Sequence, residues 1–306
     1  MMRAQYDAAT VTGAVPPSAV RYSALFYAAD VAANAHHGRH LHVLRTNLLL
    51  IIVAGLLTAC SPVLPSTTWW LWAATALVLA MGIVVQAIDR WRRHDRNWSQ
   101  YRALAEAIKG ETWRYVMSVS PYDGNATVAE ARMVANQQRF LDRYRVSAAV
   151  LGAKSTDAPP VTPEMRALRD ASLPARRSQY LQGRTTDQIR WCAAKGTHNC
   201  RVARWLFWLG QGAQGAAVMC ALWRIAHTAP LDIVPFLTAL TAVGAAWIGS
   251  GRHEELAESY RGTARELARW QDRLIAAVDE TAFGAAALGA EETIMQEWMT
   301  WATKRQ

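Results

Sequence analysis

The clearest pattern along the chain is a run of mostly apolar residues from 46 to 88 that contains no Asp, Glu, Lys or Arg. Two prolines and two serines interrupt this run at 61–66. A membrane-spanning helix needs about 20 consecutive apolar residues, so the run is long enough for two spans joined by a tight turn. We predict the first span at about residues 46–64 and the second at about 68–88, which excludes a simple soluble enzyme.

A second pair of apolar stretches covers residues 205–226 and 233–248, again separated by a short turn. The turns within the two pairs contain no Lys or Arg, whereas the segment 89–204 between the pairs holds 21 Lys and Arg residues against 11 Asp and Glu. The positive-inside rule places this basic segment in the cytoplasm, together with both termini. The pattern therefore predicts a multi-pass protein with four transmembrane helices.

The two halves of the chain have the pattern of an internal repeat. Tyr101-Arg102 follows the first pair of apolar stretches and Tyr260-Arg261 follows the second, at an offset of 159 residues. Such an offset is far too long for a solenoid repeat and is typical of a tandem duplication. Because each copy contributes an even number of spans, both copies have the same orientation, unlike the inverted repeats of many transporters.

Outside the spans, apolar residues recur at alternating spacings of three and four, in one stripe that begins at Trp98 and another that begins at Leu256. Stripes of this kind pack against partner helices in a bundle or a short coiled coil. Thr162-Pro163 has the form of a helix start, with proline at the first helical position. No convincing alternating β pattern appears, so we predict an all-α membrane protein with a cytoplasmic helical bundle.

The same pattern divides the chain into five segments. Residues 1–20 form an N-terminal tail that we expect to be disordered, and 21–120 form the first two-span repeat. Residues 121–175 form a cytoplasmic helical connector with a linker. The second two-span repeat covers 176–280, and a helical tail covers 281–306.

Sequence motifs that carry catalysis or bind cofactors are absent from the chain. There is no glycine-rich phosphate-binding loop and no nucleophile elbow. The paired carboxylates of Glu254-Glu255 are typical of a solvated helix face, and no base or nucleophile accompanies them in the sequence. We therefore predict that the protein is not an enzyme and that it needs no cofactor.

The sequence contains two weak patterns of potential metal ligands. His36 and His40 lie four residues apart and would share one helical face, but no carboxylate or cysteine is near them in the sequence. Cys192, His198 and Cys200 match no common zinc spacing. We favour an ordinary basic helix beside the membrane and predict no metal site, with a His36- and His40-dependent metal transporter as the weakest alternative.

The third apolar stretch is unusual because it contains two glutamines, Gln211 and Gln214, which are costly against lipid and should face protein or water. One interpretation is that they line an ion path, with Asn47, Thr238 and Thr241 as weaker candidates for the same role. The alternative is that they form interhelical hydrogen bonds that merely hold the helices together. Three neighbouring glycines would allow close helix packing: Gly210, Gly212 and Gly215.

The excess of positive charge in residues 89–204 also has two interpretations. Clusters such as Arg176-Arg177 could dock an anionic ligand, for example a nucleotide second messenger. Alternatively, the charge reflects the positive-inside rule and attraction to anionic lipid, which we favour. No nucleic-acid partner is expected.

Four short stretches carry a resemblance to a known family: Tyr27-Ala28-Ala29-Asp30, Tyr101-Arg102-Ala103-Leu104-Ala105-Glu106-Ala107-Ile108-Lys109, Thr112-Trp113-Arg114-Tyr115 and Asp187-Gln188-Ile189-Arg190-Trp191. They resemble the SLATT domains, the SMODS- and SLOG-associating two-transmembrane effector domains of bacteria, over about residues 20–280. The resemblance implies a conflict-system effector that forms pores or disrupts the membrane when a partner senses infection or a nucleotide signal accumulates. The family has no established catalytic residues to carry over.

We therefore expect a gated homo-oligomeric pore in the bacterial inner (plasma) membrane, whose opening permeabilises or depolarises the cell in antiphage defence. The alternative is a non-conducting membrane scaffold or sensor that recruits a cytoplasmic partner. In the pore hypothesis, the long helices after the second and fourth spans pass a cytoplasmic signal to the membrane. The residues expected to carry this coupling are Tyr101, Arg102, Glu106, Trp113, Tyr260, Arg261 and Trp270.

Overall fold

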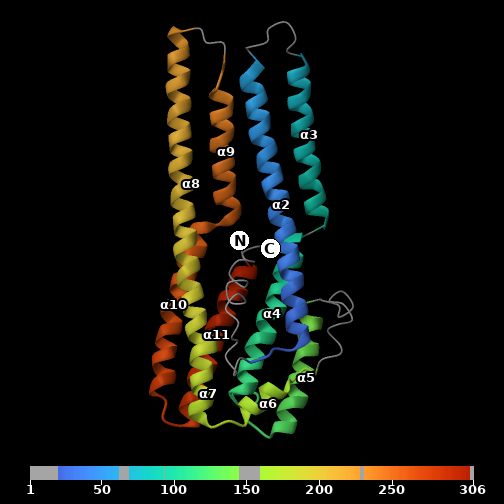
Figure 1. Ribbon diagram of the computed structural model, residues 1–306, viewed down its shortest axis with the longest axis vertical. Coiled ribbons are helices and arrows are strands. Elements are labelled where there is room, and N and C mark those ends of the chain that lie inside the picture. The colour runs from blue at the N-terminus through green and yellow to red at the C-terminus, as the bar shows by residue number, and fades with distance from the viewer. Residues whose placement is uncertain (1–19, 62–68, 93, 145–158, 228–230, 304–306) are drawn as a thin grey trace, which may run out of the picture. The chain divides into compact units, whose positions relative to one another are not determined.

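The computed structural model describes residues 20–61, 69–92, 94–144, 159–227 and 231–303, and all regular structure within them is helical (Figure 1). The all-α prediction is thereby confirmed. In chain order the helices are α2 (Ala24–Cys60), α3 (Trp69–Arg92), α4 (His94–Val116), α5 (Ala126–Arg143), α6 (Pro163–Arg169), α7 (Leu173–Tyr180), η3 (Leu181–Thr186), α8 (Asp187–Ala226), α9 (Val234–Gly251), α10 (His253–Ala276) and α11 (Glu280–Thr303).

The chain folds into two compact units that do not coincide with the two halves of the sequence. The first unit comprises Met1–Ala29, Ala103–Arg190 and Arg265–Thr300. The second unit comprises Asp30–Arg102, Trp191–Ala264 and Trp301–Gln306. Each half of the sequence therefore contributes to both units, and the boundaries between the units fall inside α2, α4, α8, α10 and the last turn of α11.

Three helical segments among the described residues are long and apolar enough to cross a membrane: Ala24–Cys60, Trp69–Val116 and Val234–Ala276. They contain the first, second and fourth predicted spans. The third predicted span, residues 205–226, forms the second half of α8 but does not reach the same apolarity. The cause is composition, because Gln211 and Gln214 interrupt its apolar residues.

The helices that carry the first and third predicted spans are longer than the spans themselves. In α2 the residues before position 46 and the span form one unbroken helix, and the same holds in α8 for the residues before position 205. The physical reason is that neither helix contains a proline, and an isolated glycine such as Gly38 or Gly196 weakens a helix without ending it. Each predicted span is therefore continuous with a helix that precedes it.

In the second unit, α8, α9, α2 and α3 follow one another side by side (Figure 1). Glycines mark the points of closest approach. A Cβ added to Gly55 of α2 would lie 2.6 Å from Ala239 Cβ of α9, and one added to Gly82 of α3 would lie 3.0 Å from Asn47 Oδ1 of α2. At Gly244 of α9, the nearest atom would be the Leu206 carbonyl oxygen of α8, at 4.0 Å. The α2–α9 contact therefore joins the two predicted hairpins.

The core of the first unit is rich in aromatic side chains. It is formed by residues of α4, α6, α7 and α11, among others, and includes Tyr115, Met165, Tyr180 and Phe283, all fully buried. The apolar stripe predicted on α4 from Trp98 onward is buried along its whole length, as expected of a helix packed within a bundle. The stripe predicted on α10 is buried most deeply at Leu267 and Leu274.

Local signals in the connector are partly confirmed. Thr162 caps α6, since its hydroxyl accepts a hydrogen bond from the Met165 amide at 3.3 Å, although α6 ends at Arg169. The connector predicted at 121–175 contains α5 (Ala126–Arg143), α6 and the start of α7. The tail at 1–19, the turn residues 62–67 and most of the linker lie outside the described residues.

Candidate functional site

The predicted pore residues of α8 lie on an open part of that helix. Gln211 and Gln214 are both exposed. A Cβ added to Gly210, Gly212 or Gly215 would meet no described heavy atom of the chain within 4 Å. Close packing of these glycines is therefore not made within one chain, and a neighbouring molecule could approach α8 here.

The three weaker lining candidates are not brought together with the glutamines. Asn47 is buried in the first hairpin, where its side chain faces Gly82. Thr238 and Thr241 of α9 donate their hydroxyl hydrogens to carbonyl oxygens of their own helix, at 2.8 Å and 3.0 Å. The lining role of all five side chains remains a prediction.

A second group of polar residues, which sequence reasoning missed, is centred on a buried ion pair in the first unit. Arg184 donates from Nε to Glu291 Oε1 at 2.9 Å and from Nη2 to Glu291 Oε2 at 2.7 Å. The two side chains are 1 % and 3 % exposed. Tyr180 donates its hydroxyl to the same Oε1 at 2.9 Å. This bidentate arrangement is the strongest geometry available to an arginine and a carboxylate.

The electrostatics of this pair follow from its burial. Desolvation alone would lower the pKa of Arg184, but the adjacent Glu291 carboxylate outweighs it and the net shift is upward. Burial, reinforced by the charge of Glu291, raises the pKa of Tyr180 well above its ordinary value. The site therefore holds a permanent guanidinium, a carboxylate and a neutral phenol in the interior of the first unit.

The backbone around Arg184 is irregular. Arg184 lies in η3, a π-helical turn between α7 and α8, whereas Glu291 lies on α11. Turns of this kind are rare and are frequently found at functional sites. A Cβ added to the neighbouring Gly183 would lie 3.4 Å from the ring of Trp113, so a small residue suits that position.

Two of the predicted coupling residues, Glu106 and Trp113 of α4, surround this pair. Glu106 is buried and its charge contributes to the raised pKa of Arg184. Trp113 donates from Nε1 to the Tyr22 hydroxyl at 2.9 Å and packs edge-on against Tyr180. Burial raises the pKa of Tyr22 as well. The buried pair and its surroundings therefore connect the start of the chain, α4, η3 and α11.

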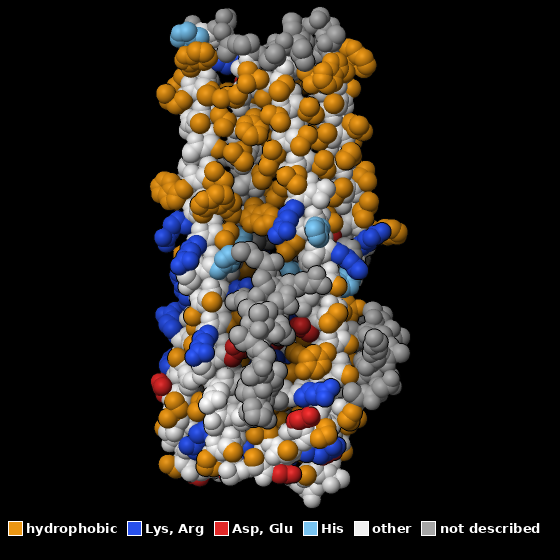
Figure 2. All heavy atoms as spheres, viewed as in Figure 1, with side chains coloured by type: hydrophobic (Ala, Val, Ile, Leu, Met, Phe, Trp, Pro, Cys, Tyr) orange, Lys and Arg blue, Asp and Glu red, His pale blue; other side chains and the backbone are white. Residues whose placement is uncertain are grey.

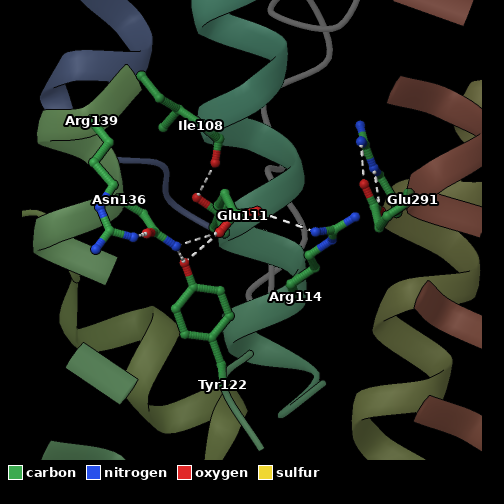
Figure 3. A network of polar contacts seen from close by, with 9 residues as sticks. Ile108, Glu111, Arg114, Tyr122, Asn136, Arg139 and Glu291 are labelled. Atoms are coloured by element: carbon green, nitrogen blue, oxygen red, sulfur yellow. Dashed lines mark hydrogen bonds and ion pairs between the residues drawn. The ribbon is translucent and has the colours of Figure 1, made fainter. Parts of the chain in front are cut away.

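A further network, shown in Figure 3, joins α4 to α5. Glu111 accepts a very short hydrogen bond from the Tyr122 hydroxyl and a second one from Asn136 Nδ2 at 3.1 Å. Asn136 also donates to the Tyr122 hydroxyl oxygen at 2.8 Å, and Arg114 lies 3.4 Å from the other Glu111 oxygen. Burial, and then the charge of Glu111, raises the pKa of Tyr122. Every polar group named here has a partner, as a stable buried network requires.

The arginines proposed from the sequence to dock an anionic ligand are engaged within the fold. Arg176 is buried, donates to the Met117 carbonyl oxygen at 2.9 Å and pairs with Glu280. Arg177 donates to the Ala277 carbonyl oxygen at 2.5 Å. These carbonyls lie at or just beyond the ends of α4 and α10, where helices leave acceptors unsatisfied. These contacts hold both guanidinium groups within the fold, and docking of an anionic ligand at Arg176-Arg177 stays a prediction.

The remaining coupling candidates make contacts between helices within their own units. Contacts of this kind are consistent with a role in transmission, which itself remains a prediction. The contacts are Tyr101 stacked on His36 at 5.4 Å, Arg102 Nη1 to Asp30 Oδ1 at 2.8 Å, Tyr260 edge-on to Trp191 at 5.2 Å, Trp270 Nε1 to Thr293 Oγ1 at 3.0 Å, and Arg261 as a hydrogen-bond partner of Cys200.

His36 and His40, the histidines of the metal-transporter alternative, contact other side chains. His36 stacks on Tyr101, and His40 Nδ1 lies 3.1 Å from Asp89 Oδ2, so that pair joins α2 to α3. Within the part of the chain that the structure describes, no group of three or more His, Cys, Asp and Glu side chains is arranged to hold a metal ion.

Comparison with known proteins identifies both halves of the chain. Residues 23–177 match the SMODS and SLOG-associating 2TM effector domain 3, and residues 180–301 match the SMODS and SLOG-associating 2TM effector domain 1. No curated protein and no solved structure matches the chain. The boundary between the two matches falls in α7, directly before the π-helical turn that carries Arg184. The chain therefore belongs to the SMODS and SLOG-associating two-transmembrane (SLATT) effector family, with two such domains in tandem, and is a membrane effector of the type used in conflict and defence systems.

Proposed function

We propose that this tandem SLATT protein forms a gated homo-oligomeric pore that permeabilises or depolarises the bacterial inner membrane. The family supplies the membrane-effector role, and the apolar helices of the second unit supply the membrane segments. In this proposal α8 provides a fourth span through residues 205–226, so that both termini lie in the cytoplasm. Arg201 and Arg204 precede that span, as the positive-inside rule requires of its cytoplasmic end.

The observation that carries the proposal is the exposure of Gln211 and Gln214 on α8. A polar amide facing hydrocarbon is costly, and such side chains in membrane helices face protein or a water-filled cavity. No described atom of the same chain covers the neighbouring glycines. A second copy packed on α8, with the amides directed to a shared aqueous path, satisfies both requirements.

Signal transmission in this proposal uses unbroken helices. Four helices, α2, α4, α8 and α10, pass from one compact unit into the other, and α11 does so in its last turn. A rigid helix carries a displacement from one end to the other more directly than a flexible loop does. The buried contacts of Glu106 and Trp113 with the Arg184–Glu291 region make α4 part of the polar core at which a cytoplasmic signal would act.

Ion flux from proteoliposomes that contain the purified full-length chain tests the proposal. The variant carries Gln211→Leu and Gln214→Leu, and the matched control carries Gln86→Leu, an exposed glutamine of α3 three residues before Asp89. We expect wild-type flux to be altered in the double variant and preserved in the control. If flux is the same in all three proteins, α8 does not line the pore. If the wild type shows no ion flux, even after candidate nucleotides and infected-cell extract are added, the result would favour the non-conducting scaffold.

A further inference from the structure

An apolar groove lies between α8 and α9 in the second unit. It has a volume of about 320 Å³ and is lined by side chains that include Val202, Leu206 and Leu209 of α8 and Leu240, Val243 and Trp247 of α9. These residues belong to the third and fourth predicted spans, at the end of each that is nearer the basic residues. The groove therefore lies within the membrane segment of the protein.

Gly244, the glycine of the groove lining, leaves open space beside α8. Asn47 and Leu206 occupy equivalent positions in the two sequence copies, 159 residues apart, and each faces a glycine on the next helix. In the first hairpin a Cβ added to Gly82 would lie 3.0 Å from Asn47 Oδ1. In the second, a Cβ added to Gly244 would reach nothing closer than the Leu206 carbonyl oxygen at 4.0 Å. Room therefore remains between α8 and α9.

An apolar groove in contact with lipid is a place for an acyl chain. A void forfeits the dispersion contacts of the atoms that line it, and no described side chain fills this one. The lining is made of aliphatic and aromatic side chains with one glycine, which matches hydrocarbon and offers no hydrogen bonds to a polar ligand.

The cytoplasmic end of the groove is positively charged. Arg201 and Arg204 flank Val202 on α8 and are exposed, and Arg252 ends α9 five residues after Trp247. Near this end Glu255 lies 3.8 Å from Arg252, and the neighbouring Glu254 is exposed. Figure 2 shows Lys and Arg side chains gathered at one end of the broad apolar surface formed by α8, α9, α2 and α3. Guanidinium groups at this depth suit a phosphate of the headgroup layer.

We propose that the groove between α8 and α9 binds one anionic phospholipid of the cytoplasmic leaflet. One acyl chain lies in the groove along Leu206 and Gly244, and the headgroup phosphate lies against Arg201, which directly precedes Val202 of the lining. The charge of the site selects a lipid with a net negative headgroup, such as phosphatidylglycerol, over the zwitterionic phosphatidylcholine. The inference needs only membrane insertion of the chain and is independent of pore formation.

Native mass spectrometry of the full-length chain, released from a neutral detergent after exposure to phosphatidylglycerol or phosphatidylcholine, tests this site by counting retained lipids. We expect one phosphatidylglycerol per chain in the wild type. Gly244→Leu fills the groove and abolishes retention, whereas Gly249→Leu, at an open position of the same helix, preserves it. If Gly244→Leu impairs folding, Gly244→Ala provides a smaller change at the same position. We expect Gly244→Ala to retain an intermediate amount of phosphatidylglycerol.

A second pair of variants tests the charge. The Arg201→Gln variant is expected to lower phosphatidylglycerol retention about fivefold, the factor that one basic residue near an anionic surface contributes. The Arg90→Gln and Arg92→Gln double variant, which changes two exposed arginines of α3, is the control and keeps wild-type retention. Equal retention of both lipids by the wild type would overturn the anionic selectivity. Retention by Gly244→Leu at the wild-type level would overturn the site itself.

Discussion

Arg184 and Glu291 form a bidentate ion pair in the interior of the first unit, although 107 residues separate them in the sequence. Arg184 lies in the π-helical turn at the start of the second SLATT domain, and Glu291 lies on the last helix. Tyr180 donates to the same carboxylate, and the charge of Glu106 from the first domain adds to the field at the guanidinium. Both residues of the pair belong to the second domain, and the charge of Glu106 acts on it from the first.

Removing one partner of this pair should destabilise the protein strongly. Arg184→Leu leaves the Glu291 carboxylate buried without its counter-charge, and we expect the free energy of unfolding to fall by about 3–5 kcal/mol. The Arg184→Leu and Glu291→Leu double variant should recover part of that loss, because no isolated charge remains. Denaturant unfolding of the purified chain in detergent, followed by circular dichroism, measures both.

The matched control for the buried pair is Glu266→Gln. Glu266 pairs with Arg269 at 2.9 Å, but these side chains are 47 % and 71 % exposed, so water screens the interaction. We expect a change within about 0.5 kcal/mol. A single Arg184 variant as mild as this control would contradict a central role for the buried pair.

Acid should weaken the contact between α5 and α6. Hydrogen bonds from Arg166 lower the pKa of Glu130 below its ordinary value of 4.5. A carboxyl whose pKa is lowered by folding stabilises the native state above pH 4.5, and this contribution is lost as the pH falls through the folded-state value. Because the pair is partly exposed, its contribution should be below about 1 kcal/mol.

Glu130→Gln isolates that contribution. The thermal midpoint of the variant should lie below the wild-type midpoint at neutral pH and coincide with it in strong acid. Arg166→Gln should show the same convergence, since either change removes the same ion pair. A gap between wild type and variant that persists unchanged at low pH would show that the charge of Glu130 is not the cause.

Local sequence signals were sufficient for the helices and the tandem organisation. The spacing of apolar residues from Trp98 to Tyr115 predicted the buried face of α4, because residues three and four positions apart lie on the same side of a helix. Charge-free length predicted the apolar character of α2 and α3. Neither signal required knowledge of any distant residue, and the repeat at Tyr101 and Tyr260 required only comparison of the chain with itself.

The buried polar core could not be predicted in the same way. Arg184 lies in a segment rich in arginines, and nothing in its immediate sequence separates it from the exposed Arg190. Its partner Glu291 stands beside Glu292, and paired carboxylates are typical of a solvated helix face, yet Glu291 is 3 % exposed. Whether such residues are buried or exposed depends on contacts with residues more than 100 positions away in the sequence. Gln211 and Gln214, in contrast, stand out locally because polar residues are rare within an apolar run.

Contact between the two hairpins should depend on Gly55. A Cβ added there would lie 2.6 Å from Ala239 Cβ of α9, which is closer than real contacts allow, and 3.2 Å from the Pro235 carbonyl oxygen, which is tight. Gly55→Ala should therefore push α2 and α9 apart at a cost of about 1–3 kcal/mol. The thermal midpoint in detergent measures the loss. Gly249→Ala, at an open position of α9, is the control and should not lower the midpoint.

Cysteine cross-linking tests whether α8 faces a second copy of the chain. In a variant without the four native cysteines, Gln214→Cys should form disulfide-linked dimers in membranes under mild oxidation, because the exposed face of α8 would be covered by a neighbouring molecule. Ile83→Cys, which introduces a thiol at a highly exposed position of α3, provides the comparison. We expect it to remain monomeric when α3 faces lipid. Efficient cross-linking at Ile83 with none at Gln214 would show that the copies contact each other through α3. It would contradict the proposal that Gln211 and Gln214 face an aqueous path between copies.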